Sequence, residues 1–194
     1  LVKSVALKSA MGQADKLASF WDEANKVASA AAIIANLLNK GNLADNAYML
    51  GLFHNAGIPI MMLKYDDYES ILQFAKQNGW DKAIEQEREQ YGTAHTTISA
   101  LLGQQWKLPS VMSEVIYYQL DTDGLFNSGE LSDLGIDLMC ILKLARLAVY
   151  LQSNPEGISS EWQLIEDDIL ERLNMDEEDL EELREKILDE LSAI

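Results

Sequence analysis

The chain has 194 residues and a mass of 21.7 kDa, enough for one sizeable domain or for one domain with a small appendage. Hydrophobic residues make up 48% and charged residues 24%, a composition that is typical of folded globular proteins and argues against disorder. The formal net charge of −17, from 15 basic and 32 acidic residues, argues against nucleic acid or an anionic membrane surface as a partner.

The first predicted element is a long helix over residues 20–38, with a packing side that is rich in alanine. Small side chains allow neighbouring helices to approach closely. The longest apolar candidate in the chain, residues 27–38, is interrupted by Ser29 and Asn36 and is shorter than the roughly 20 residues that span a bilayer. Residue 1 is Leu rather than Met, so we expect the N-terminus to be incomplete.

An apolar helix follows and ends at the polar pair His54 and Asn55, with Gly57 and Pro59 as stop signals. A polar pair at the end of a buried helix suits a binding site better than a plain surface. These residues are therefore the first candidates for a functional site.

Further helices are predicted in the middle of the chain. Residues 67–77 form one, and Gly79 follows its end as a stop signal. His95 lies near the start of the next, and the segment 106–109 breaks the chain before another helix begins. No convincing alternating strand and no internal repeat is present. We therefore expect an all-α fold, a globular bundle of roughly eight to ten helices.

Apolar residues at helical spacing predict a further long helix over residues 132–152. It contains the single cysteine, Cys140, which we expect to be an inert thiol in the core. A cysteine without a partner excludes an internal disulfide and fits a reducing cytoplasm, so we expect a cytoplasmic protein. The segment 153–160 is rich in turn formers and indicates a connection.

The residues beyond that connection, 153–194, form a predicted acidic helical extension. Residues 161–194 contain 14 acids and 3 bases, whereas residues 1–160 contain 18 acids and 12 bases. Ser160 begins a capping-box pattern before one helix, and Asp176 can cap the last helix. We expect this last helix to pack on the main domain with an acidic outer face. An interaction arm and a dimerisation helix are the alternatives.

Three blocks of the sequence carry a resemblance to a known family. They are Phe-Trp-Asp-Glu-Ala at 20–24, Gly-Leu-Phe-His-Asn-Ala-Gly at 51–57, and a long third block that joins residues 87–95 to Trp-Lys-Leu-Pro at 106–109 and Val-Ile-Tyr-Tyr-Gln at 115–119. In this order they resemble the HDOD family, a branch of the HD phosphohydrolase superfamily, over roughly residues 17 to 152. The third block is the most specific. The resemblance implies an HD-like helical domain over residues 1–152 and a role in bacterial signal transduction.

Active members of that superfamily bind a divalent metal through histidines and an aspartate, and they hydrolyse phosphoesters. Most of the matching positions hold other residues in this sequence: Glu23 and the pair Gln119-Leu120 stand where histidines are expected, Asn55 and Arg146 where aspartates are expected, and Ile58 where a lysine is common. Only His54 and His95 remain of the expected site histidines. A neutral amide lacks the charge that hard metals need, and an inward-pointing arginine would repel them. We therefore expect no metal, no cofactor and no catalytic residue.

The resemblance implies a pocket that is now a ligand site, and six residues are the candidates to line it: Glu23, His54, Asn55, His95, Tyr118 and Gln119. The leading hypothesis is a non-catalytic signalling or scaffolding module with a degenerate HD-type metal site. Its expected partner is a regulatory or signalling protein, and a small phosphoester is a further candidate ligand.

Two alternatives belong to other functional classes. The first is a divergent metal-dependent phosphohydrolase for a phosphoester or cyclic nucleotide, with Glu23, His54 and His95 as a reduced ligand set, because three ligands and a water can make a catalytic zinc site. The second is a nucleotide-binding module without catalysis. The absence of a Gly-rich phosphate loop argues against it.

Overall fold

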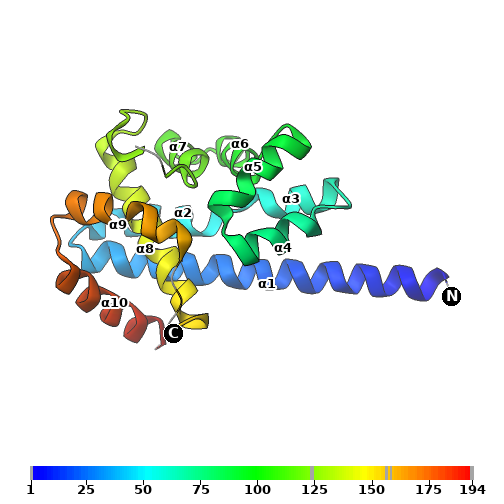
Figure 1. Cartoon of the computed structure of the whole chain (residues 1–194), viewed down its shortest axis with the longest axis horizontal. Helices are drawn as coiled ribbons and strands as arrows, with labels where there is room; N and C mark the ends of the chain where they lie inside the picture. The colour runs from blue at the N-terminus through cyan, green and yellow to red at the C-terminus, as the bar shows by residue number, and fades with distance from the viewer. Residues whose placement is uncertain (1, 123–124, 156, 158, 193–194) are drawn as a thin grey trace.

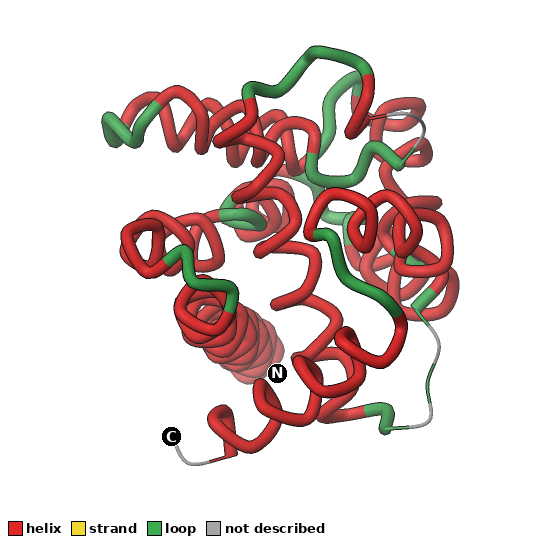
Figure 2. Tube along the Cα trace, turned by 90° about the vertical axis from the view of Figure 1, so that its left-hand side faces the viewer, coloured by secondary structure: helices red, strands yellow, loops and turns green. Residues whose placement is uncertain are grey.

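The structure, a computed structural model, describes residues 2–122, 125–155, 157 and 159–192, and only the backbone of residues 2–16 and of residue 127. Its regular elements are all helical: α1 (Val2–Leu37), α2 (Ala44–Phe53), α3 (Gly57–Lys64), α4 (Glu69–Asn78), α5 (Trp80–Tyr91), α6 (His95–Gln105), α7 (Ser110–Tyr118), α8 (Asp133–Ser153), α9 (Ser160–Leu173), α10 (Glu177–Ser192) and the short 3₁₀ turns Gly41–Leu43 and Leu125–Asn127. Figure 2 shows these helices joined by loops, with no strand in the part of the chain that is described. The predicted all-α fold is confirmed.

Helix α1 runs along one side of the bundle, and its N-terminal half projects beyond the other helices (Figure 1). The predicted helix begins at Phe20, where the packing pattern begins, whereas the helical backbone begins at Val2. Its alanine-rich side is buried against α2. At the crossing, a Cβ on Gly51 would lie 2.6 Å from the Cα of Ala28, so only glycine permits this approach of the two helices.

Helix α8 forms the centre of the main hydrophobic core. Its residues from Leu138 to Leu142 are fully buried in this core, and the helix packs against α1, α2, α7, α9 and α10. Full burial of each aliphatic side chain stabilises the fold by about 1.5–3 kcal/mol. Cys140 lies in this core as predicted, and burial raises the pKa of its thiol to about 12, which explains an inert thiol.

The turn after α2 differs from the prediction. Gly57 and Pro59 do not stop a helix; they lie in the first turn of α3, where proline is tolerated. The Gly57 amide donates to Ser99 Oγ at 2.7 Å, and a Cβ on Gly57 would lie 2.1 Å from the carbonyl oxygen of His95. This close approach of α3 to α6 fixes the short turn that carries His54 and Asn55.

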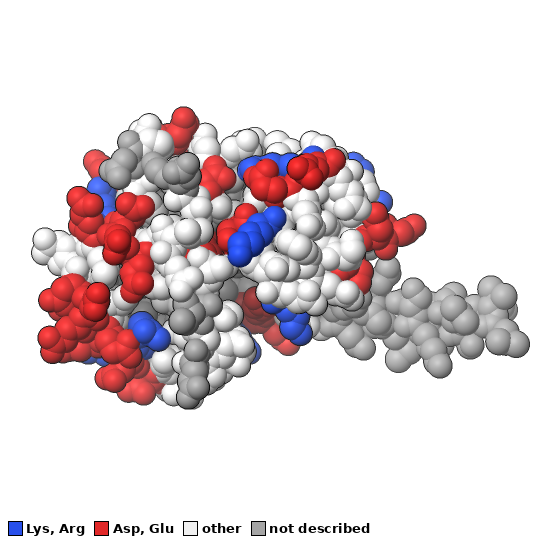
Figure 3. Space-filling view, viewed as in Figure 1, with Lys and Arg blue, Asp and Glu red and all other residues white. Residues whose placement is uncertain are grey.

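The predicted extension packs on the main domain through α9 and α10. Trp162, Ile169 and Leu183 are buried in the same core cluster as α8. The cap of α9 is Ser159, one residue before the predicted Ser160, because its Oγ accepts from the Trp162 amide. Figure 3 shows acidic side chains gathered over α10, which agrees with the expected acidic outer face.

The last helix begins at a reciprocal cap, as the sequence indicated for Asp176. The Asp179 amide donates to Asp176 Oδ1 at 2.9 Å, and the Asp176 amide donates to Asp179 Oδ2 at 3.1 Å. None of the described helices is long and apolar enough to cross a membrane.

Candidate functional site

A cleft of about 1060 Å³ lies between α1, the turn from α2 to α3, the junction of α4 and α5, the C-terminal half of α8 and the start of α9. Of the six predicted site residues, Glu23, His54 and Asn55 line this cleft. Glu23 is exposed on α1, whereas His54 is buried at the inner end of α2. The structure therefore brings together half of the predicted set.

His54 presents a neutral imidazole to the cleft. Its Nδ1 lies 2.7 Å from the carbonyl oxygen of Gly51, which can only accept, so Nδ1 carries the proton. Burial, together with the positive charge of Arg146, lowers the pKa of His54 to about 3. At neutral pH, Nε2 is therefore an unprotonated acceptor beside a cation.

Gln119 does not line the cleft but forms a hydrogen bond to the backbone of His54 from the protein interior. This fully buried side chain follows α7, and its Nε2 donates to the carbonyl oxygen of His54 at 2.5 Å. The carbonyl oxygen of Gln119 in turn accepts from Lys143 Nζ. Its Oε1 has no hydrogen-bond partner among the described residues. Gln119 thus links the turn between α2 and α3, through its side-chain amide, to Lys143 on α8, through its backbone carbonyl oxygen.

Three charged residues outside the predicted set form a compact cluster at the cleft. Lys143 Nζ lies 2.5 Å from Glu161 Oε1, and Arg146 Nη2 lies 2.8 Å from Glu161 Oε2. Lys143 and Arg146 project from α8, whereas Glu161 lies in the first turn of α9. All three line the cleft. The predicted extension therefore contributes directly to the site.

The charges of this cluster are not balanced. Burial alone would raise the pKa of Glu161, but Arg146 and Lys143 outweigh it and hold that pKa below its usual range. Burial lowers the pKa of Lys143, although Glu161 acts in the opposite direction. With Glu161 ionised, one carboxylate faces two cationic side chains in a chain whose net charge is −17.

His95 lies in a separate buried network rather than in the cleft. Its Nδ1 and its backbone amide lie 2.7 Å and 3.1 Å from Glu87 Oε2, and Tyr68 Oη donates to the other oxygen of Glu87. Trp80, which lines the cleft, places its ring centroid 4.4 Å from that of His95. Within the described part of the chain, His95 Nε2 has no partner.

Tyr118 also lies away from the cleft lining, because its hydroxyl donates to Glu130 Oε2 at 2.9 Å. His95, Tyr118 and Gln119 were grouped with His54 by family resemblance. The structure instead gives each of them a polar partner, Glu87 for His95, Glu130 for Tyr118 and the carbonyl oxygen of His54 for Gln119, and none of the three lines the cleft.

The residues present do not fit a divalent metal. No group of three or more His, Cys, Asp or Glu side chains in the described residues is arranged to hold one. His54 lies beside Arg146, and the carboxylate of Glu161 is held by two cations. At about 4 Å and an effective dielectric near 20, each cation would oppose each unit of metal charge by roughly 4 kcal/mol.

Solved structures with a similar fold are found among bacterial proteins. A provisionally named phosphohydrolase from Shewanella amazonensis SB2B superposes with a TM-score of 0.61 at 22% identity, over 89% of this chain and 60% of that chain. An HDOD domain protein of unknown function from Geobacter sulfurreducens gives 0.53 at 18% identity, over 88% and 61%. The chain thus spans about 60% of the length of these structures. At such identities the likeness shows the fold.

The comparison with curated proteins gives no match. The HDOD domain family, in contrast, matches residues 1–122, which is more than half of the chain and includes the blocks around His54 and His95. The match and the shared helical fold agree with the resemblance that these blocks carry. The chain belongs to the HDOD domain family.

Proposed function

We propose that this chain is a non-catalytic, cytoplasmic module of bacterial signal transduction or scaffolding, with a degenerate HD-type metal site. One observation carries the proposal: Arg146 projects from α8 into the cleft beside His54, and Lys143 shares the carboxylate of Glu161 with it. A divalent ion bound at His54 would face these cations. The chain keeps the helical fold of the family, but its cleft holds ion pairs between Lys143, Arg146 and Glu161 instead of a set of metal ligands.

The competing hypothesis, a phosphohydrolase with Glu23, His54 and His95 as metal ligands, is disfavoured by the same geometry. Glu23 and His54 line the cleft, but His95 is engaged by Glu87 and does not line it. A phosphoesterase also needs an activated water, which a metal with three protein ligands would supply. Only two of the three proposed ligands line the cleft, so this source of an activated water is disfavoured.

Elemental analysis of the chain, purified without chelator, tests the proposal together with a phosphoester assay in added Mn²⁺. We expect far less than one metal ion per chain and no turnover. About one metal ion per chain that is lost in His54→Ala, or turnover that His54→Ala abolishes, would overturn it. The variant Asn55→Asp/Arg146→Asp, which restores two acidic positions and removes one cation, is a matched control and is expected to bind Mn²⁺ more tightly than the wild type.

The signalling part of the proposal rests on the resemblance and predicts a regulatory or signalling protein as partner. Cross-linking mass spectrometry in the native cells tests it. A reproducible cross-link to such a protein supports this part, and cross-links to no regulatory protein overturn it.

A further inference from the structure

We infer that Lys143 and Arg146 form a binding site for a phosphate-like oxyanion, and that Glu161 occupies this site as an internal ligand. The inference deepens the proposed function and rests on it, because the proposed function leaves the cleft without a metal and available to another ligand. It assigns the ligand class to the cleft: a small anion or the phosphate group of a larger molecule.

The geometry around Glu161 is that of a bound oxyanion. Arg146 reaches both carboxylate oxygens, with Nη2 at 2.8 Å from Oε2 and Nη1 at 3.2 Å from Oε1, and Lys143 Nζ lies 2.5 Å from Oε1. A two-pronged contact from arginine is the arrangement that carboxylates and phosphates share. A phosphate group that replaced the carboxylate would find the same donors in place.

The site is built into the fold and is open at one side. The Lys143 side chain is 1% exposed and is held by the carbonyl oxygen of Gln119, so it forms the floor. The side chains of Arg146 and Glu161 are 15% and 12% exposed and border the cleft. A solute in the cleft can therefore reach the position of the carboxylate, and Lys143 keeps its contact with the carbonyl oxygen of Gln119 when the carboxylate leaves.

Outside the cluster of Lys143, Arg146 and Glu161, the cleft lining is balanced in charge, with three basic and three acidic residues. The whole lining contains five basic residues and four acidic ones, although the whole chain has 15 basic and 32 acidic residues. The basic residues of the lining are Lys26, Lys76, Lys82, Lys143 and Arg146. If Glu161 withdraws, three acidic residues remain in the lining. The whole lining thus has one basic residue more than acidic ones in a strongly acidic protein, so an anion is repelled less there than at the other surfaces.

Chemical rescue of Glu161→Ala tests the inference in the whole chain of 194 residues. Thermal melts are recorded in EDTA with sodium chloride, formate or phosphate at equal ionic strength. We expect Glu161→Ala to melt below the wild type in chloride, and phosphate or formate to restore much of the difference. By calorimetric titration, phosphate is expected to bind Glu161→Ala about tenfold or more tightly than it binds the wild type, in which Glu161 competes.

Three further variants make the result specific. The isosteric Glu161→Gln is also expected to gain phosphate binding, whereas Glu161→Ala/Arg146→Gln is expected to lose it. Asp167→Ala, which removes an exposed acid from the same helix, is the matched control and is expected to respond to phosphate as the wild type does.

Two outcomes would overturn the inference. One is a folded Glu161→Ala or Glu161→Gln that responds to phosphate and chloride alike. The other is a failure of both variants to fold even in phosphate, because a site for an oxyanion would accept the substitute. The EDTA separates this test from the proposed function: phosphate binding to Glu161→Ala together with stoichiometric metal in the untreated wild type would overturn the proposed function alone.

Discussion

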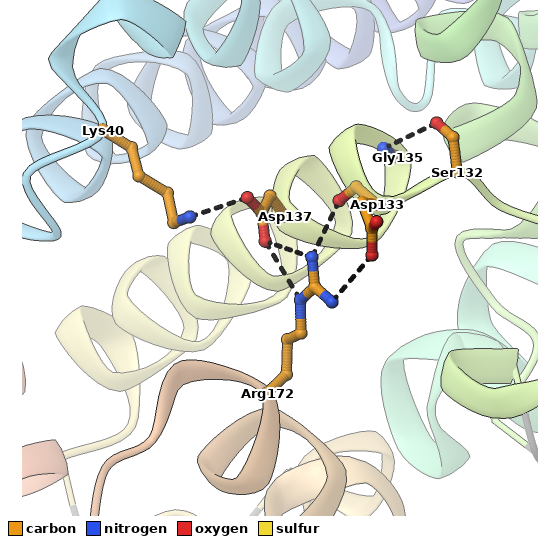
Figure 4. A network of polar contacts seen from close by, with 6 residues as sticks. All are labelled: Lys40, Ser132, Asp133, Gly135, Asp137 and Arg172. Carbon is orange, nitrogen blue, oxygen red and sulfur yellow. Dashed lines mark hydrogen bonds and ion pairs between the residues drawn. The ribbon is translucent and has the colours of Figure 1, made fainter.

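The two ends of α9 are both held by ion pairs with α8, but the pairs differ in burial and in charge balance. At the C-terminal end, Arg172 contacts Asp133 and Asp137, and Lys40 reaches Asp137 at 2.6 Å (Figure 4). Two acids there face two bases, and water reaches most of them.

At the N-terminal end, the single carboxylate of Glu161 faces Lys143 and Arg146 in the cleft. The balanced, partly exposed network fastens a helix, and solvent can replace each of its contacts. The unbalanced, buried cluster depends on its one anion. The difference indicates that an ion cluster with excess charge in a cleft is a better candidate for a site than a neutral network on the surface.

The largest effect is expected from removing the one anion of the buried cluster. Glu161→Ala leaves Lys143 and Arg146 without a counter-charge, and breaking a buried pair in this way costs about 3–5 kcal/mol. Urea unfolding in chloride buffer measures it against Asp167→Ala. A free energy of unfolding equal to that of the control would show that the cluster contributes no more than the surface network.

As the pH falls, the free energy of unfolding should first decrease because of His54 in the cleft, before the carboxylates of the Arg172 network are protonated. The pKa of His54 is about 3 in the folded chain and 6.5 in the unfolded one, so the unfolded state takes up the proton first and stability falls with pH below 6.5. Between about pH 7.5 and pH 5, this costs about 2 kcal/mol. Urea unfolding against pH in wild type and His54→Asn, whose amide can still donate to Gly51, measures the difference. If the free energy of unfolding depended on pH in the same way in both proteins, this expectation would be contradicted.

A smaller effect is expected from Arg172→Gln at the other end of α9. Its partners Asp133 and Asp137 keep access to water, so the loss should be about 1 kcal/mol. Added salt should reduce the difference from the wild type, because exposed charges are screened. Unfolding midpoints at low and high sodium chloride test this. A loss as large as that of Glu161→Ala, unaffected by salt, would remove the contrast between the two ends.

The smallest effect is expected from Asp133→Asn. The side chain of Asp133 is 91% exposed, and Asp137 remains to hold Arg172. We expect an unfolding midpoint in urea that cannot be distinguished from that of the wild type. A clear decrease would show that the network in Figure 4 acts as a unit rather than as separate pairs.

Part of the site could be predicted from local patterns. The polar pair His54-Asn55 at the end of an apolar helix indicated the cleft, and its block matched the family. Lys143 is also marked in the sequence, because a lysine in the apolar run 138–145 must either be buried with a partner or interrupt the packing. Glu161 is not marked in this way, because it is one of 14 acids in its segment.

The placement of His95 could not be predicted, for a different reason. Sequence order put it in the pocket by resemblance, but the buried carboxylate of Glu87 on α5 holds its Nδ1. That pairing depends on how α5 and α6 pack, which the motif does not encode. The placement of Gln119 could not be predicted either, because its side-chain amide donates to the carbonyl oxygen of His54 on a distant segment.

By itself, the sequence determined the all-helical class and the course of most helices, but not α3 or α5, which no pattern had predicted. Helical hydrogen bonds and caps such as that of Asp176 join residues four or fewer positions apart, so a local pattern contains them. Only the tertiary structure decided which charges share the cleft. Lys143 and Arg146 meet Glu161 across a turn, and His54 meets Arg146 from a distant helix. Such pairings depend on packing between helices, and they decide whether the site suits a metal or an anion.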